Sequence, residues 1–338
     1  NLSWGGIARS TFLAIGLGVF LAPGVEAAPP VLAVSVQAYG LHSCALTSGG
    51  GVKCWGWNAH GQLGDTSTTD RPAPVDVADL ASGVVAVVAG DFHTCALTTG
   101  GGVKCWGDNA WGQLGDGTND DHPRPVDVLG LTSGVVAISA GDSHTCAITG
   151  EGGLKCWGYN LEGKLGDGTD IDRNAPVNVA GLASGVLAVS AGWYHTCAMT
   201  TGGEMKCWGN NGFGQLGDGT QTGRMTPGNV TGLGTSVTAI SAGPTHTCAV
   251  TAAGGAKCWG NNDYGQLGND STSQSLAPVD VAGLGSGVEA VAAAGYSHSC
   301  ALMADGSVKC WGDNSSGQLG DGTVTSSLVP VDVAALGN

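Results

Sequence analysis

Short runs of apolar and small residues recur along the chain, and each run is closed by glycine or by a polar turn. One stretch illustrates the pattern, with runs at residues 84–90, 93–98 and 103–107 and a fourth run at 125–128 after a polar loop. Runs of this length between turn residues are typical of β-strands. Nothing in the stretch has helical length with a 3.6-residue period. The pattern therefore predicts four short strands in succession.

This four-strand unit occurs six times. The two cysteines of each copy lie ten residues apart, and the distance between copies is 51 residues from Cys44 to Cys95 and 52 from Cys248 to Cys300. A period near 50 residues is typical of propellers and solenoids, and one four-stranded sheet per copy makes a propeller blade. We therefore predict an all-β fold, a β-propeller of four-stranded blades over residues 31–338. Six repeats favour six blades, with seven as the alternative.

Composition and charge narrow the possible partners. Glycine contributes 61 of the 338 residues and charged residues only 12%, which suits tight turns between short strands. The 27 acidic and 12 basic residues give a net charge of −15. A chain with this charge repels phosphate, so we expect no nucleic-acid partner.

The first residues differ from the repeats. Arg9 precedes an apolar run at 11–21, and small residues at Val25 and Ala27 fit a signal-peptidase site. We therefore predict a signal peptide over residues 1–27, with a buried or interfacial strand as the alternative. The run is too short to span a membrane, so the expected location is secreted, periplasmic or on the cell surface.

Three motifs at fixed spacing point to a known family. They are His-Thr-Cys-Ala-Leu at 93–97, Lys-Cys-Trp-Gly-x-Asn at 104–109 and Gly-Gln-Leu-Gly-Asp-Gly-Thr at 112–118. Together they resemble the regulator-of-chromosome-condensation repeat over residues 31–338. The resemblance implies a β-propeller, usually of seven blades. We expect a closed ring of six, in which the last strand completes the first blade if blade and repeat are offset by one strand.

The resemblance also bears on activity. Eponymous family members exchange guanine nucleotides through an inserted hairpin, but the six copies here have nearly constant length, so we expect no such activity. The chain is similar in layout to the secreted bacterial β-lactamase inhibitor protein II type, which binds its target with one propeller rim. It differs from that type in carrying a cysteine pair in every copy.

The cysteines predict one disulfide in each blade. Each pair flanks a hairpin symmetrically, so its members lie directly opposite each other on neighbouring strands. The predicted bridges are Cys44–Cys54, Cys95–Cys105, Cys146–Cys156, Cys197–Cys207, Cys248–Cys258 and Cys300–Cys310. Zinc on cysteine and histidine is the alternative, but no second histidine recurs, so we expect neither a metal nor another cofactor. The Asp-Gly segment has two interpretations, a calcium-binding loop and a turn, and we favour the turn.

Other recurring residues are interpreted as framework. One histidine per copy is expected to bond a turn, and one tryptophan per copy, at 55, 106, 157, 208, 259 and 311, is expected to fill each blade interface. Six of the seven lysines directly precede the second cysteine. Strand alternation places them on the face opposite the cysteine, where a charge needs either a partner or an exposed edge.

The remaining aromatic residues fall in two loops that emerge at the same end of each blade. One loop joins the first and second strands, and the other joins the third and fourth. The candidate binding residues there are the aromatics Tyr39, Trp57, Phe92, Trp111, Tyr159, Trp193, Tyr194, Phe213, Tyr264 and Tyr296, interleaved with Asp91, Asp142 and Glu162. The opposite end carries no aromatic residue. Local capping of the propeller is the alternative explanation for these rings.

This aromatic rim favours a binding module that docks a partner protein, because Tyr and Trp are common anchors of interfaces. A carbohydrate-binding propeller is the alternative. An enzyme such as a glycosidase or lyase requires a distinct carboxylate pair. Glu162 and Asp108 are the nominees, but no pair stands out, and we expect no catalytic residues. We expect a monomer with an unknown protein or glycan ligand.

Overall fold

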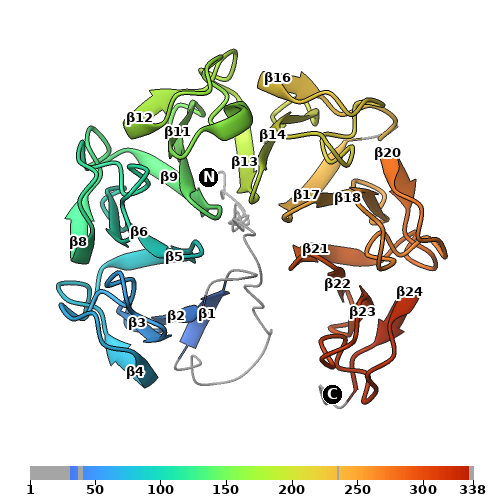
Figure 1. Cartoon of the computed structure of the whole chain (residues 1–338), viewed down its shortest axis with the longest axis horizontal. Coiled ribbons are helices and arrows are strands. Elements are labelled where there is room, and N and C mark those ends of the chain that lie inside the picture. Colours follow the sequence, from blue (N-terminus) through green and yellow to red (C-terminus); the bar gives the residue numbers. More distant parts are fainter. Residues whose placement is uncertain (1–30, 37–40, 234–235, 335–338) are drawn as a thin grey trace, which may run out of the picture.

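Six four-stranded antiparallel sheets are arranged as blades around a central axis (Figure 1). The computed structural model describes residues 31–36, 41–233 and 236–334. Each sheet uses four strands that are consecutive in the chain, with the first strand nearest the axis and the fourth at the periphery. The predicted all-β propeller of six four-stranded blades is confirmed.

The strands have nearly identical lengths in all six blades. The inner strands are β1 (Val31–Val36), β5 (Val84–Ala89), β9 (Val135–Ala140), β13 (Val186–Ala191), β17 (Val237–Ala242) and β21 (Val288–Ala294). The second strands are β2 (His42–Thr47), β6 (His93–Thr98), β10 (His144–Thr149), β14 (His195–Thr200), β18 (His246–Thr251) and β22 (His298–Met303). The third strands are β3 (Val52–Gly56), β7 (Val103–Gly107), β11 (Leu154–Gly158), β15 (Met205–Gly209), β19 (Ala256–Gly260) and β23 (Val308–Gly312). The outer strands are β4 (Arg71–Asp76), β8 (His122–Asp127), β12 (Arg173–Asn178), β16 (Arg224–Asn229), β20 (Ser275–Asp280) and β24 (Ser327–Asp332), and the short 3₁₀ turn η1 spans Leu161–Gly163.

All six predicted disulfides are present. In the first blade Cys44 pairs with Cys54, and the two residues lie directly opposite each other in the β2–β3 register. The same holds in the other five blades, and the described residues contain no free cysteine. In most proteins, structural disulfides persist only in an oxidising compartment. The bridges therefore indicate an oxidising environment.

Hydrophobic cores lie between consecutive blades. In the described part of the chain there are five such clusters, one at each junction from the first to the sixth blade. The tryptophan of each later blade packs against the blade before it, as Trp106 does against Leu46 and Val52, and Trp106, Trp157, Trp208, Trp259 and Trp311 are fully buried. Trp55 in the first blade is only partly buried. The expectation of one tryptophan per interface therefore holds at five junctions, because the described residues place no blade before the first.

The expected closure of the ring by the last strand is wrong. Strand β24 pairs with β23 in its own sheet, and β1 to β4 form a complete sheet of their own. Blade and repeat therefore coincide. The reason lies in the turn after each outer strand, where Val77 and Leu80 pack beneath the second blade and carry the chain onward to β5. Figure 1 shows an opening in the ring of described blades between β1–β4 and β21–β24.

A repeated set of hydrogen bonds joins each blade to the next. The carbonyl oxygen of Gln62 accepts from Trp106 Nε1 at 2.9 Å and from Thr94 Oγ1 at 2.9 Å. Because the threonine hydroxyl gives its only proton to that carbonyl, it must accept from His42 Nε2, which lies 2.8 Å away. The same arrangement recurs at the following four junctions. The structural role expected for the histidines is thus observed, although the bond reaches the next blade and not a turn.

The recurring lysines have cross-strand partners. Lys53 Nζ lies 2.6 Å from an oxygen of Asp76, the residue directly opposite it in the β3–β4 register. Aspartate or asparagine holds this partner position in every blade. The pairs are solvent-exposed, so each contributes little to stability. Their regularity instead helps to set the register of the outer strand.

The expected signal peptide at 1–27 lies outside the described residues and stays a prediction. Among the residues that are described, no helix has the length and apolar character needed to cross a membrane.

Acid should destabilise the protein through its buried histidines. Burial lowers the pKa of His42 to about 4, and those of His93, His195 and His246 to about 3. The unfolded chain binds these protons below pH 6.5 while the folded chain does not, so the free energy of unfolding falls as the pH decreases from 6.5 toward 3–4. We expect a loss of roughly 2 kcal/mol per histidine between pH 7 and pH 5.

Urea unfolding of the oxidised protein at several pH values measures this effect. His195→Gln, which cannot titrate, should reduce the pH dependence, because it removes one of the histidines whose pKa burial lowers. A pH dependence that is equally steep in the His195→Gln variant would contradict the assignment.

Candidate functional site

The candidate surface lies at one end of the propeller. Because the strands of every blade alternate in direction, the connection between the first and second strands lies at the same end as the connection between the third and fourth. We call this the loop end. Both aromatic-rich segments belong to it, as the sequence predicted.

Backbone contacts hold the two connections of each blade together. The amide of Asp108 donates to the carbonyl of Phe92 at 2.9 Å, and the matching bond recurs in the other blades. Gly107, with φ of +106°, makes this approach possible, because a Cβ there would lie 2.6 Å from the Phe92 carbonyl oxygen. Side chains at positions 92 and 108 are therefore presented next to each other.

A buried asparagine organises each long loop between the third and fourth strands. In the second blade Asn109 Oδ1 accepts from the amide of Leu114, and its Nδ2 donates to Asp116 and Thr118. Asp116 in turn accepts from the amide and hydroxyl of Thr118, which is an Asx-type turn. These bonds agree with the turn interpretation of the Asp-Gly segment. They fix the loop without using the variable residues beside it.

At the centre of the loop end, three blades contribute to one polar cluster. Asp91, Asp142 and Trp193 occupy equivalent positions in the second, third and fourth blades. The indole Nε1 of Trp193 donates to Asp91 Oδ1 at 3.3 Å. Lys164 is only 1% exposed and places its ammonium 2.9 Å from Asp142 Oδ1 and 2.8 Å from the carbonyl of Trp193. A buried cation therefore joins two of the predicted site residues.

The pKa values of the two carboxyl groups in this cluster, Asp91 and Asp142, are shifted in opposite directions. Burial raises the pKa of Asp91 to about 7, and repulsion by Asp142 adds to the rise against the effects of Trp193 and Lys164. Burial also acts to raise the pKa of Asp142, but the charge of Lys164, with help from His144, outweighs it and lowers the pKa overall. Asp142 is thus the charged partner of the lysine, while Asp91 gains or loses its proton near neutral pH.

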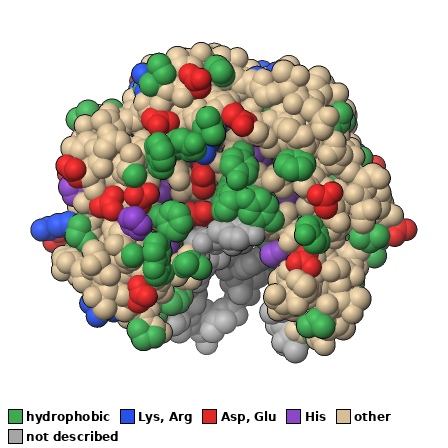
Figure 2. Space-filling view, in the orientation of Figure 1, with side chains coloured by type: hydrophobic (Ala, Val, Ile, Leu, Met, Phe, Trp, Pro, Cys, Tyr) green, Lys and Arg blue, Asp and Glu red, His purple; other side chains and the backbone are tan. Residues whose placement is uncertain are grey.

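Seven of the nine described rim aromatics form three groups around this centre. Trp193 packs edge-on against Tyr194 and Tyr296, whose hydroxyls lie 3.3 Å apart although their blades are not adjacent. A second group pairs Trp111 with Tyr159 at 4.7 Å between ring centroids. The third group joins Trp57 and Phe92, at 5.4 Å, with His60. Figure 2 shows hydrophobic side chains gathered around the middle of this view, with acidic side chains among them.

Several predicted site residues are freely accessible. Trp111 is 43% exposed and Tyr264 is 54% exposed, and Tyr194 and Phe213 are also exposed. Trp57, Phe92, Tyr159, Trp193 and Tyr296 are half-buried, so none of the nine described rings is buried in the core. Tyr39 lies outside the described residues.

The two acidic residues nominated for catalysis are not a pair. Glu162 is exposed and accepts from Asn210 Nδ2 in the fourth blade. Asp108 is buried at the junction of the first and second blades, beside His60. The two carboxyl groups thus belong to different junctions.

The opposite end carries different chemistry. Two pockets there are lined mainly by glycine and by small or polar residues, including Gly134, Ser133, Asn178 and Ser236. None of the residues that line these pockets is aromatic. The aromatic chemistry of the variable loops therefore belongs to the loop end.

Sequence reasoning missed two contributors to the loop end. Lys164 is the lysine that does not precede a cysteine, and it replaces the glutamine found at the same position of the other five copies, as in Gln113. That departure from the repeat was a usable signal. Asp121 lies in a variable polar loop, and nothing in the repeat pattern pointed to its contact with His60 at 2.8 Å.

Comparison with known proteins now identifies the family. The model of the RCC1-like domain matches residues 12–338. The chain belongs to the RCC1-like family. It is 34% identical over 311 residues to the ultraviolet-B receptor UVR8 of Arabidopsis thaliana, covering 90% of this chain and 71% of that protein. It is 33% identical over 304 residues to the E3 ubiquitin-protein ligase HERC2 of Homo sapiens, covering 86% of this chain but only 6% of HERC2.

Solved structures agree with this assignment at the level of the fold. Human WBSCR16 superposes with a TM-score of 0.79 at 24% identity, covering 90% of this chain and 82% of that chain. Yeast RCC1 (Prp20), solved in complex with Kap60, gives 0.78 at 23% identity, covering 90% and 74%. The RCC1-like propeller is therefore the scaffold on which the loop end is built.

Ionisation of Asp91 should be visible at Trp193. Above pH 7 the Trp193 indole N–H donates to a carboxylate, and below it to a neutral carboxyl, so the indole proton resonance should shift with a midpoint near pH 7. A ¹H–¹⁵N NMR titration measures this shift, with Trp193→Phe to assign the signal. Asp91→Asn should abolish the titration of the indole signal. Asp263 is an exposed acid of the loop end, and Asp263→Asn should leave that titration unchanged. A midpoint below about pH 5 would refute the raised pKa of Asp91.

Replacing Lys164 by the repeat residue should destabilise this RCC1-like propeller. Lys164→Gln leaves Asp142 without its cation, and because Asp142 is 17% exposed we expect a loss of about 1–3 kcal/mol in the free energy of unfolding, less than for a fully buried pair. Adding Asp142→Asn should recover part of the loss. Equal losses in the single and double variants would show that the two charges do not interact.

Proposed function

We propose that this RCC1-like propeller is a binding module that docks a partner protein on the aromatic and acidic residues of its loop end. The observation that supports this proposal most directly is that buried and exposed positions of the repeat differ in how much they vary. Buried framework residues recur at every junction, whereas the exposed loop-end positions change from Trp111 to Phe213 to Tyr264. Large rings at positions that the fold does not require are the usual anchors of protein interfaces.

The charge of the chain suggests the kind of partner. The net charge is −15, and exposed acids such as Glu162 and Asp263 lie among the loop-end aromatics. A partner with a basic surface would gain mainly in association rate, and this gain would fall with added salt. Lys164, the lysine of the loop end, does not repel a basic partner, because it is buried against Asp142.

The disulfides and the predicted signal peptide suggest the location. Six bridges suit a protein that folds in an oxidising compartment. We therefore propose that the mature propeller acts outside the cytoplasm, as a secreted, periplasmic or cell-surface protein. Among its relatives, yeast RCC1 has been solved bound to a protein, Kap60.

A carbohydrate ligand is the second candidate. Trp111 is 43% exposed and packs against Tyr159, and Asn119 and Asp120 are exposed in the same loop. An exposed ring beside amides and carboxylates is also a platform for a sugar. A glycan array separates the candidates, because repeated binding to one sugar class would favour this one.

Affinity capture from the extracellular fraction of the source organism, followed by measured affinities for the captured protein, tests the docking proposal. Trp111→Ala combined with Tyr264→Ala should weaken binding at least about tenfold, because each exposed anchor contributes on the order of 1 kcal/mol or more. Leu129→Ala is the matched control, since Leu129 is 58% exposed and follows an outer strand at the opposite end. Unchanged affinity in the double variant, or an equal loss in the control, would disprove the proposal.

A further inference from the structure

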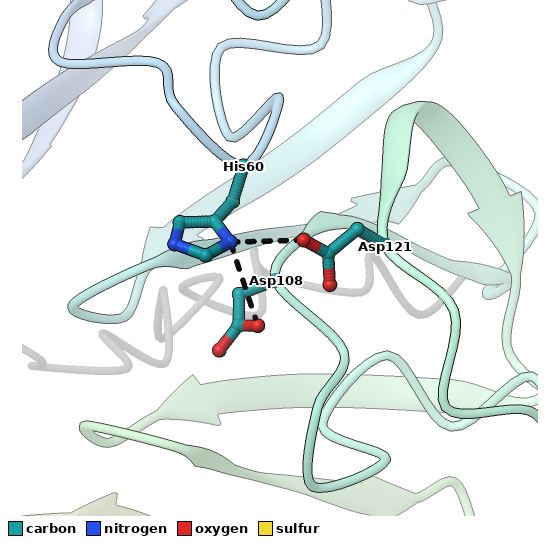
Figure 3. A group of neighbouring side chains, drawn as sticks. All are labelled: His60, Asp108 and Asp121. Atoms are coloured by element: carbon teal, nitrogen blue, oxygen red, sulfur yellow. Dashed lines mark hydrogen bonds and ion pairs between the residues drawn. The ribbon is translucent and has the colours of Figure 1, made fainter.

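Three polar side chains meet at the junction of the first and second blades (Figure 3). His60 lies in the β3–β4 loop, Asp108 directly follows β7, and Asp121 directly precedes β8. His60 Nδ1 lies 2.8 Å from Asp121 Oδ2 and 3.7 Å from Asp108 Oδ1. The candidate ligand atoms all lie within 4.8 Å of one another. We propose that these three residues form a binding site for a zinc ion, a function separate from partner docking.

The spacing of the atoms suits a tetrahedral ion. Nitrogen and oxygen ligands lie about 2.0–2.2 Å from zinc, which places them roughly 3.3 Å from one another. The two nitrogen–oxygen distances, 2.8 and 3.7 Å, lie on either side of that value. All three atoms lie within 4.8 Å of one another, so small movements of the side chains would bring them to that spacing, and a fourth position stays open.

Each carboxylate is already held by its other oxygen. Asp121 Oδ1 accepts from the amide of Asn109 at 2.8 Å, and Asp108 Oδ2 accepts from Gln113 Nε2 at 2.6 Å. This leaves Asp121 Oδ2 and Asp108 Oδ1 directed toward His60, although the latter also accepts from Ala110 at 3.2 Å. Hydrogen bonds of this kind orient the ligands of metal sites and raise their affinity.

The other junctions show that the fold does not require this combination. The positions of His60, Asp108 and Asp121 are occupied at the following junctions by Trp111, Tyr159 and Asp172, then Glu162, Asn210 and Gly223, then Phe213, Asn261 and Gln274, then Tyr264, Asp313 and Ser326. Histidine occurs at the first junction alone among these. A purely structural contact would be served by any of the alternatives that the repeats already use.

The donor set selects zinc over the common alkaline-earth ions. Zinc accepts both imidazole nitrogen and carboxylate oxygen as ligands, whereas Ca²⁺ and Mg²⁺ prefer oxygen ligands alone. The rings of Trp57 and Phe92 lie 5.5 and 6.0 Å from the His60 ring and cover part of its surroundings. The ion would join the first two blades, and its open position would take water or a ligand from outside.

Calorimetric titration of tag-free, chelator-treated protein with zinc chloride tests the proposal, and cobalt(II) supplies a visible spectrum that reports tetrahedral coordination. We expect saturable binding of one ion that excess Mg²⁺ and Ca²⁺ do not displace. His60→Asn and Asp108→Asn should each weaken it at least about tenfold. Circular dichroism would confirm that each variant remains folded.

Two variants provide matched controls. His122 lies 3.0 Å from Asp116 and is another histidine–aspartate pair in the second blade, while Asp313 holds the position of Asp108 at the last junction. His122→Asn and Asp313→Asn should bind zinc like the parent protein. The proposal is overturned by an absence of saturable binding, by full binding in the His60→Asn variant, or by an equal loss in the His122→Asn variant.

Discussion

One shared acceptor fastens each blade to the next. The carbonyl oxygen at position 62 of the first blade, and its equivalent in the next four, receives an indole N–H and a hydroxyl from the following blade, the hydroxyl being threonine at four junctions and Ser299 at the last. The hydroxyl is thereby forced to accept from the histidine of the preceding blade. Since all of these groups are buried, each must be satisfied by another, and loss of one leaves a desolvated polar group behind. The order and spacing of the blades depend on this set.

The same set of hydrogen bonds explains why the side chains at the loop end can differ from one blade to the next. The acceptor is a backbone oxygen, so the side chain at that position can change without losing the contact, and Lys164 stands where the other copies have glutamine. Its ammonium is then available to neutralise Asp142 beneath the central aromatics. The repeat thus holds the scaffold with its main chain and leaves side-chain chemistry open at the exposed end.

The junctions consequently share a backbone and differ in chemistry. At the first one a histidine meets two aspartates, at the second Trp111 packs against Tyr159, and at the third Glu162 meets Asn210. A surface built in this way combines an ionisable centre, ring platforms and acidic groups within one rigid frame. Rigid presentation lowers the entropy lost when a partner binds.

The sequence by itself determined the repeat, the strands, the disulfides and the end at which the aromatics emerge. Those features depend on local spacing, because alternation in a hairpin places Cys95 opposite Cys105 whatever the rest of the chain does. It did not determine how the blades meet. The contact of Lys164 with the carbonyl of Trp193 and the meeting of Tyr194 with Tyr296 join residues of different blades, 29 and 102 positions apart. Only the curvature of the ring brings such residues together, and that curvature arises from packing between blades, which no single repeat contains.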